Sequence, residues 1–216
     1  MTRRRFPVGK TLLYVFMSLW ALTTIYPFIW VILNSFKPRG LIRSDTFSLP
    51  VGDKFTLENY VTAFKRVDIG TAYVNSIVIS GAVTVVVMVL AGLAAYAMVR
   101  YSFRLRGFLH SMIIASMMFP VFSTIIPVFR MESSWGIVNT GSIWLTRLSV
   151  VLPQIAGNLS FAIIVLMGFI RSLPVDLEEA AYLEGYNVYQ IFFRIIMPLA
   201  KPSFATVGIF TFLWSY

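Results

Sequence analysis

Long runs of residues without a charged side chain recur along this chain and alternate with shorter polar segments. No charged residue lies between Lys10 and Lys37, and three further uncharged runs cover residues 69–99, 107–129 and 148–170. A helix rises about 1.5 Å per residue, so about 20 apolar residues cross a hydrocarbon core of about 30 Å. The pattern therefore predicts four complete membrane spans, at residues 11–33, 72–98, 107–129 and 148–170.

A fifth apolar segment follows Lys201. As a helix, Pro202 to Tyr216 would extend about 22 Å, which is shorter than the bilayer core. We therefore predict an all-α polytopic membrane helix bundle with four complete transmembrane helices and a truncated fifth, so that either the sequence is a fragment or its end is atypical.

Composition supports a membrane protein over a soluble domain. Hydrophobic residues make up 58% of the 216 positions and charged residues 12%, with a mean hydropathy of +0.79. A soluble domain carries about 25% charged residues. The net charge of +9 comes from Lys and Arg between the apolar runs, a distribution that sets membrane topology and does not indicate nucleic-acid binding. The absence of cysteine excludes disulfides, thiol catalysis and Cys-ligated metal.

Basic residues also predict the orientation. Arg3, Arg4, Arg5 and Lys10 precede the first span without an acidic residue, which places residues 1–10 in the cytoplasm. The acid-free loop that contains Arg100, Arg104 and Arg106 fits a return to the same side. Residues 34–70 then form an external segment, and so does the connector after the third run, which contains Glu132, Trp135, Gly136, Asn139 and Gly141.

The external segment contains an amphipathic pattern. Thr56 is a candidate cap for a short helix whose apolar side chains recur at helical spacing, at Leu57, Tyr60, Val61 and Phe64. We expect this helix to anchor the segment at the lipid interface, in preference to a docking role for an external partner.

Residues 171–201 form a cytoplasmic segment that is neither a span nor a plain loop. Pro174 and Asp176 favour a helix start, and Gly185 favours a left-handed stop. Asn187 and Gln190 have the spacing of a capping box for a second helix, which Pro198 would end. The segment is thus predicted to be a helix, a sharp glycine turn and a second helix.

One spaced motif runs through this segment. Glu-Ala-Ala, three residues, Gly, nine residues, Ile, one residue and Met-Pro are in register at Glu179, Ala180, Ala181, Gly185, Ile195, Met197 and Pro198. The motif resembles the EAA motif of importer permeases, E-A-A-x3-G-x9-I-x-L-P, with Met197 in place of the usual leucine, a substitution of similar volume. The chain therefore resembles the maltose-type permeases of the binding-protein-dependent sugar importers, a family of ATP-binding-cassette (ABC) transporters.

The likeness extends over almost the whole chain from Thr11 onward. It is carried by Tyr26-Pro27-Phe28-Ile29-Trp30, Asn34-Ser35-Phe36-Lys37, Leu57-Glu58-Asn59-Tyr60, Asn75-Ser76, Ala94-Ala95-Tyr96-Ala97 with Arg100 and Phe103, Pro120, Pro127, Gly136-Ile137-Val138-Asn139-Thr140 and Leu173-Pro174.

This resemblance implies a type I ABC importer fold over residues 71–216 and a multi-pass location in a bacterial or archaeal cell membrane. The expected function is translocation of a sugar or related solute. The implied partners are a second permease subunit, a solute-binding protein outside the cell, membrane lipid and an ABC ATPase dimer, which binds ATP and Mg. Glu179, Ala180, Ala181, Gly185, Ile195 and Pro198 would couple the permease to that ATPase.

Sequence motifs that this chain lacks help to decide between the possible functions. The chain contains no G-x-x-x-x-G-K-[ST], so we expect no ATPase site, and hence no cofactor and no enzyme activity, in this chain itself. An ion-driven secondary transporter is the alternative, but the four predicted spans contain no carboxylate, and His110 alone is more typical of an interfacial residue than of a relay. An intramembrane enzyme would need a catalytic cluster that the sequence does not show.

Substrate contacts are not assigned by the sequence. Several polar residues within the spans could face a translocation path or hydrogen-bond between helices, and the second role is the commoner one for each. They are Asn75, Ser76, Thr84, Ser116, Ser123, Gln154, Asn158 and Ser160.

Overall fold

The computed structural model describes residues 8–216, in which every regular element is a helix. The arginines at positions 3, 4 and 5, from which the sequence predicts a cytoplasmic N-terminus, lie outside the described residues. The chain divides into two compact units, Met1–Gly70 and Thr71–Tyr216.

Three helices are long and apolar enough to cross a membrane: α1 (Val8–Ser35), α4 (Ile69–Arg100) and α7 (Ile143–Ser172). Two further spans are possible if each of two bent helix pairs crosses as one. The first pair, α5 (Arg106–Ser116) and α6 (Val121–Ser134), bends by 105°, and the second, residues 188–199 and α11 (Lys201–Ser215), bends by 82°. The part of the chain that the structure describes therefore holds three to five candidate spans.

The third predicted span, residues 107–129, is divided between two helices. The chain leaves α5 after Ser116 and resumes with Pro120 in an extended conformation (φ −66°, ψ 123°) directly before α6. Proline has no backbone N–H and disfavours helical geometry at the residue before it, so the break falls at this position. Pro127, by contrast, lies inside α6.

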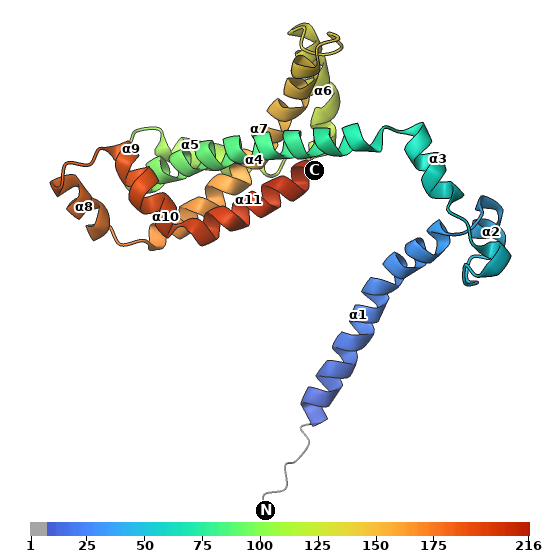
Figure 1. Cartoon of the computed structure of the whole chain (residues 1–216). Helices are drawn as coiled ribbons and strands as arrows, with labels where there is room; N and C mark the ends of the chain where they lie inside the picture. The colour runs from blue at the N-terminus through green and yellow to red at the C-terminus, as the bar shows by residue number, and fades with distance from the viewer. Residues whose placement is uncertain (1–7) are drawn as a thin grey trace, which may run out of the picture. The chain divides into compact units, whose positions relative to one another are not determined.

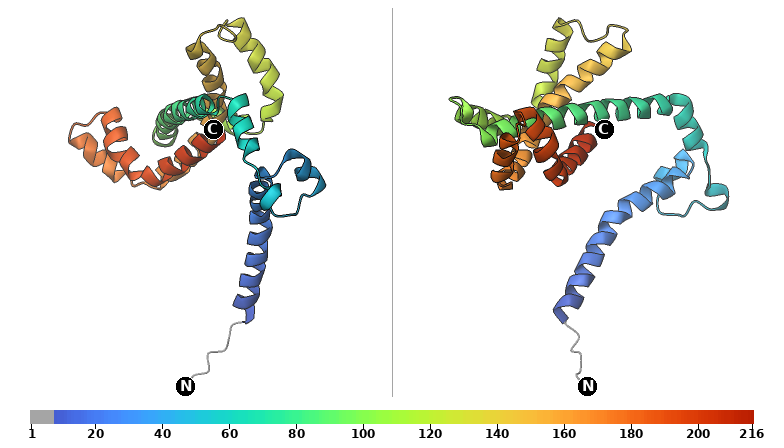
Figure 2. Two further views of the ribbon diagram at one scale, coloured as in Figure 1. Left: turned by 45° about the vertical axis from the view of Figure 1, so that its right-hand side comes forward. Right: turned by 60° about the vertical axis from the view of Figure 1, so that its left-hand side comes forward.

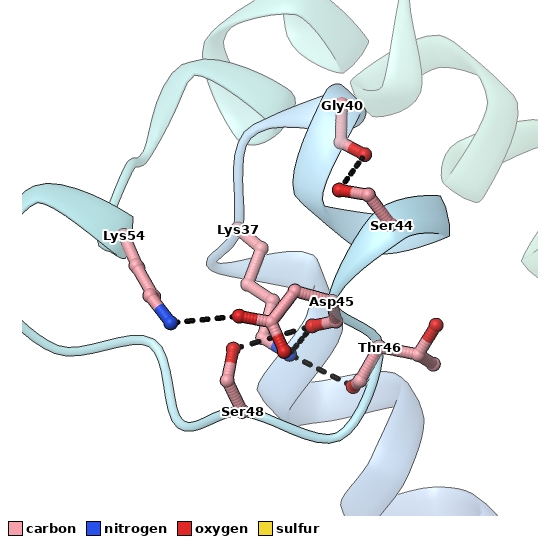
Figure 3. A network of polar contacts seen from close by, with 7 residues as sticks. All are labelled: Lys37, Gly40, Ser44, Asp45, Thr46, Ser48 and Lys54. Atoms are coloured by element: carbon pink, nitrogen blue, oxygen red, sulfur yellow. Dashed lines mark hydrogen bonds and ion pairs between the residues drawn. The ribbon is translucent and has the colours of Figure 1, made fainter.

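The first unit contains α1 and a folded polar segment with α2 (Arg39–Ser44), a 3₁₀ turn η1 (Gly52–Lys54) and α3 (Glu58–Arg66). Lys37 is fully buried there, and its Nζ donates to the carbonyls of Asp45 (3.0 Å) and Thr46 (2.8 Å) (Figure 3). The Asp45 carboxylate pairs instead with Lys54 at 2.7 Å, and this bond lowers its pKa, so the pair stays charged at neutral pH.

α3 is tied to the end of α1. The Asn59 side chain donates to the carbonyls of Ser35 and Lys37, and the Tyr60 ring packs on Phe36 with ring centroids 5.3 Å apart. The Thr56 hydroxyl accepts from the backbone N–H of Glu58 (3.1 Å), but Leu57 occupies the cap position, one residue later than expected.

The core of the second unit lies where α4, α7 and α11 pack together (Figure 1). Buried members include Val87 and Ala91 of α4, Leu166 of α7 and Val207 of α11. Gly92 allows this close approach, because a Cβ there would meet the Phe204 and Phe192 rings at 2.8 and 2.9 Å. A larger side chain at this position would therefore require the helices to repack, because protein interiors are closely packed.

Between α7 and α11 the chain forms α8 (Asp176–Leu183), α9 (Val188–Ile191), a π-helical stretch η2 (Phe192–Ile196) and α10 (Met197–Leu199). In Figure 1, α8 and α9 lie at the end of this unit where α4 finishes. α6 and the first part of α7 project from the layer of α4 and α11, as both views of Figure 2 show.

Candidate functional site

The turn between α8 and α9 has the geometry that the sequence predicts. Gly185 has φ +85°, the left-handed conformation that favours glycine. The N–H of Gly185 bonds to the carbonyl of Tyr182, and the N–H of Tyr186 bonds to the carbonyl of Ala181, both at 3.0 Å. These two bonds define a Schellman motif, which closes the C-terminal end of α8. The predicted glycine stop is confirmed.

The second helix also begins as expected. Asn187 Oδ1 accepts from the backbone N–H of Gln190, and Gln190 Oε1 accepts from the backbone N–H of Asn187, both at 2.9 Å. This reciprocal pair is a capping box. The helix ends one residue after the predicted Pro198, since α10 continues to Leu199 and the 82° bend follows it. The π-helical stretch η2 ends at Ile196, two residues before Pro198, and its hydrogen-bond spacing differs from that of an α-helix.

A buried ion pair holds α8 against α4. Arg100, the last residue of α4, places its Nε 2.5 Å from Glu178 Oε1 and donates from Nη2 to the Leu173 carbonyl at 2.9 Å. The hydroxyl of Tyr96 donates to Glu178 Oε2 at 2.7 Å. The side chains of Arg100 and Glu178 are only 11% and 5% exposed. Both oxygens of this carboxylate are thus satisfied, as a buried charge requires.

Helix dipoles reinforce the pair. Arg100 lies at the C-terminal end of α4, Glu178 lies in the first turn of α8, and Leu173 offers a carbonyl from the end of α7. Each charge therefore has the sign that its helix terminus favours. As a result, three helices are joined at one point by Arg100.

A second contact lies beside the ion pair. The hydroxyls of Tyr101 and Tyr182 are 2.9 Å apart. Burial and this hydrogen bond raise the pKa of Tyr101, so its hydroxyl remains neutral at physiological pH.

The residues of the spaced motif divide between surface and core. Glu179, Ala180, Gly185 and Pro198 are exposed, whereas Ala181 is buried in the core and Ile195 packs partly against it. Glu179 was the carboxylate singled out from the sequence, and it points to solvent while its neighbour Glu178 makes the internal contacts. Leu183, at the end of α8, is 90% exposed.

Sequence reasoning missed Glu178 and used Arg100 only for topology and for the family resemblance. A signal was present, because Glu178 and Ala181 are three residues apart and share a helix face. If the alanine on this face packs against the core, the carboxylate beside it is buried too and needs a cation as its partner. The sequence alone does not show that Arg100, 78 residues earlier, provides it.

Polar residues of the spans mostly make local or interhelical bonds. Ser116 and Ser160 hydrogen-bond to each other, Arg147 donates to Asn75 Oδ1 at 2.8 Å, and Thr84 donates to the Ser80 carbonyl. Glu132, which the sequence suggested lies in a connector, is instead a buried residue of α6. A carboxylate therefore lies within one of the bent helix pairs. The lack of carboxylates in the spans predicted from the sequence is then no argument against an ion-driven carrier.

The fold is that of an ABC importer. A crystal structure of "a bacterial ABC transporter involved in the import of the acidic polysaccharide alginate" matches all of this chain and 73% of its own, with a TM-score of 0.80 at 23% sequence identity. An exposed glycine turn joined to the bundle by a buried ion pair lies within this fold.

The chain belongs to the family described as the binding-protein-dependent transport system inner membrane component, whose model matches residues 88–216. It is therefore classed with the membrane components of such systems, and the ion-driven alternative is set aside on this ground.

Curated relatives agree with the family. The chain is 36% identical over 200 residues to the diacetylchitobiose uptake system permease protein NgcG of Streptomyces coelicolor, covering 93% of this chain and 64% of the relative. It is 32% identical to the trehalose transport system permease protein SugB of Mycobacterium tuberculosis, covering 89% and 67%. It is 30% identical to the melibiose/raffinose/stachyose import permease protein MelC of Bacillus subtilis, covering 88% and 66%. The chain thus spans about two thirds of the length of these relatives.

Proposed function

We propose that this chain is part of a permease subunit of an ATP-driven importer that translocates a sugar delivered by an external binding protein. The observation that carries the proposal is the exposed α8 turn, which contains Glu179 and Gly185 and is joined through Glu178 and Arg100 to α4 and α7. Family membership and the names of the relatives support the sugar assignment.

The turn would act as a rigid coupling element. Its outer side presents Glu179, Ala180 and Leu183 to a partner, and its inner side is fixed by Glu178, so a displacement of α8 by a docked ATPase subunit would move α4 and α7 as well. Coupling by this route depends on fit and rigidity, and it needs no chemistry within the turn. Gly185, Ile195 and Pro198 would maintain the shape of the turn and of the helix that follows it.

The topology we propose has five crossings. α1, α4, the α5–α6 pair and α7 form four complete spans, and α11 forms part of a fifth. Residues 1–10 and 171–201 would lie in the cytoplasm and residues 34–70 outside, in the inner membrane of a bacterial or archaeal cell.

We propose four kinds of partner: a second permease subunit, an ABC ATPase dimer that holds ATP and Mg, an extracytoplasmic solute-binding protein, and lipid. The large apolar side chains of α1 support the lipid contact, since Leu12, Trp20 and Phe28 are each about two thirds exposed.

The test is reconstitution of the full-length protein with the products of its neighbouring genes. Co-purification in mild detergent, ATP-dependent sugar uptake in proteoliposomes and stimulation of ATP hydrolysis by the loaded binding protein are expected together. Uptake by the full-length protein alone, driven by an ion gradient, would contradict the proposal. A binding protein that takes only peptides, metals or phosphate would contradict the sugar assignment.

Orientation has an independent test. Single cysteines placed in this Cys-free chain at Gln190 and Phe47 should react with an impermeant thiol reagent from opposite sides of the membrane. Both side chains lie in polar segments, and Phe47 is 81% exposed. Labelling of position 190 from outside the cell overturns the topology.

A further inference from the structure

Two neighbouring residues at the end of α4 contact two successive turns of α8. Arg100 donates to Glu178, and the hydroxyl of Tyr101, the next residue, lies 2.9 Å from that of Tyr182. Glu178 and Tyr182 are four residues apart in α8, so they lie on the same face of that helix. The end of α4 therefore holds α8 at two points along its length.

The two points of attachment differ in burial and in strength. The side chains of Arg100 and Glu178 are 11% and 5% exposed, whereas Tyr101 and Tyr182 are 38% and 46% exposed. Separating the ion pair would leave two buried charges without partners, which is costly. The contact between the two hydroxyls involves no formal charge, and water can replace it because both residues are partly exposed. The ion pair is thus the strong attachment, and the tyrosine contact is the weak one.

Tyr96 of α4 connects the two points. Its hydroxyl donates to Glu178 Oε2 at 2.7 Å, and its ring packs edge to face with the Tyr101 ring, with centroids 6.0 Å apart. This ring contact holds Tyr101 beside α4 while the Tyr101 hydroxyl reaches α8. Movement of Tyr182 away from Tyr101 therefore breaks one hydrogen bond and leaves the packing on α4 in place.

Tyr182 connects the weak contact to the exposed turn. It directly precedes Leu183, which is 90% exposed, and its backbone carbonyl accepts from the N–H of Gly185 in the Schellman motif. The bonds that close this motif involve backbone atoms only, so loss of the Tyr182 hydroxyl leaves the turn formed. A force on the exposed end of α8 therefore acts next to the weak contact, and Glu178 lies one turn further from it.

We infer that the contact between Tyr101 and Tyr182 is a clasp, which holds α8 in the orientation of this structure and opens when a docked ATPase subunit moves the helix. The inference rests on the proposed import function and gives a positioning role to two residues that the spaced motif does not specify. When the clasp opens, α8 turns about the pair of Arg100 and Glu178, because the strong attachment persists while the weak one breaks. The closed clasp opposes this motion, so it restrains ATP hydrolysis until the binding protein delivers solute.

Dityrosine formation measures whether the clasp is closed. Photo-oxidation with a ruthenium tris-bipyridyl salt and persulfate joins two tyrosine rings in contact through a carbon atom beside each hydroxyl. Mass spectrometry then quantifies the product that links Tyr101 to Tyr182 in the full-length permease within its complex, without nucleotide and with the non-hydrolysable analogue adenylyl imidodiphosphate. Tyr182→Phe removes the product and so identifies it. Tyr189→Phe is the matched control, because Tyr189 lies on α9 and is 67% exposed.

We expect the yield of linked product to fall about twofold or more when the analogue shifts α8 to its open orientation. Tyr101→Phe and Tyr182→Phe should each raise ATP hydrolysis without binding protein by about two- to tenfold, the range by which one uncharged hydrogen bond shifts an equilibrium. The double variant should raise it no further, because the two hydroxyls form a single bond. Tyr189→Phe should leave the rate unchanged. Thermal stability of the isolated permease should stay near wild type in all variants, which distinguishes a clasp from a merely structural contact.

Failure of the clasp and failure of the import function give different results. In a complex that couples ATP hydrolysis to sugar uptake, a linked product that is absent, or whose yield is unchanged or higher with the analogue, overturns the clasp and leaves the import function standing. Additive effects of Tyr101→Phe and Tyr182→Phe on hydrolysis overturn it as well. A purified full-length permease that retains no ATPase subunit rejects the proposed function and the clasp together.

Discussion

Arg100 and Glu178 form a buried ion pair that connects the end of α4 to the first turn of α8, with Nε and Oε1 2.5 Å apart. Arg100 also reaches the Leu173 carbonyl at the end of α7, and Tyr96 donates to the second carboxylate oxygen. The proposed coupling element is therefore fixed to the bundle by charge as well as by apolar contact. This arrangement has a measurable energetic consequence.

Glu178→Ala should destabilise the permease by about 3–5 kcal/mol, because it leaves Arg100 buried without its counter-charge. The double variant Arg100→Met with Glu178→Met should recover much of this loss, since no unpaired charge remains. Thermal unfolding of the purified complex measures both. Glu179→Ala is the matched control, because this neighbouring carboxylate is exposed and should matter little for stability. Additive losses in the double variant would mean that the two residues do not act as a pair.

Gly185 should tolerate asparagine and not valine. At φ +85° a β-branched residue is strained by about 1–3 kcal/mol, whereas asparagine adopts the left-handed region more readily. No described atom lies within 4 Å of an added Cβ, so backbone strain and not collision decides the result. In proteoliposomes, Gly185→Val should hydrolyse ATP with reduced uptake or lose the ATPase subunit, while Gly185→Asn stays near wild type. The amount of assembled complex is measured for both variants, and identical assembly and coupling in both would contradict this role of the turn.

Local signals predicted much of this site, and long-range contacts account for what they missed. The Gly185 turn and the Asn187–Gln190 capping box depend on residues within five positions of each other, so sequence spacing is enough to specify them. The uncharged run at residues 107–129 does not specify the 105° bend at Pro120, because a proline can kink or end a helix without determining the bend angle. The partner of Glu178 lies 78 residues away, and only packing selects it.

Lys37 shows the same limit in the first unit. From the sequence it counts as one more external charge, yet it is fully buried and donates to two backbone carbonyls, while Lys54 takes the nearby carboxylate. Helical periodicity gives no information on such an irregular segment.

Lys37→Met should loosen the segment between α2 and α3, because the carbonyls of Asp45 and Thr46 lose their donor, at a cost of about 1–3 kcal/mol each. Lys54→Met should have a smaller effect, since the pair with Asp45 is about 40% exposed. Hydrogen exchange over residues 45–60 is the appropriate measurement. Faster exchange in the Lys37 variant is expected, and equal exchange in both variants would show that burial of Lys37 does not hold the segment.

The exposed side of α8 should govern attachment of the ATPase more than stability of the permease. Leu183 is 90% exposed, and Glu179 lies one helical turn before it. An aspartate at Leu183 would place a charge where a docked partner excludes water, so Leu183→Asp should weaken ATPase binding by about 2 kcal/mol or more. Glu179→Lys should act in the same direction but more mildly, because a solvated charge contributes less.

Two measurements distinguish an effect on ATPase attachment from an effect on permease stability. The first is retention of the ATPase subunit during purification, and the second is the thermal stability of the isolated permease, which should not change. Tyr189→Asp provides a control, since Tyr189 is 67% exposed on the second helix and outside the α8 turn. Release of the ATPase by Leu183→Asp, and not by Tyr189→Asp, would place the docking surface on α8. Equal retention in all three variants would mean that the ATPase attaches elsewhere and that the turn only closes a cytoplasmic loop.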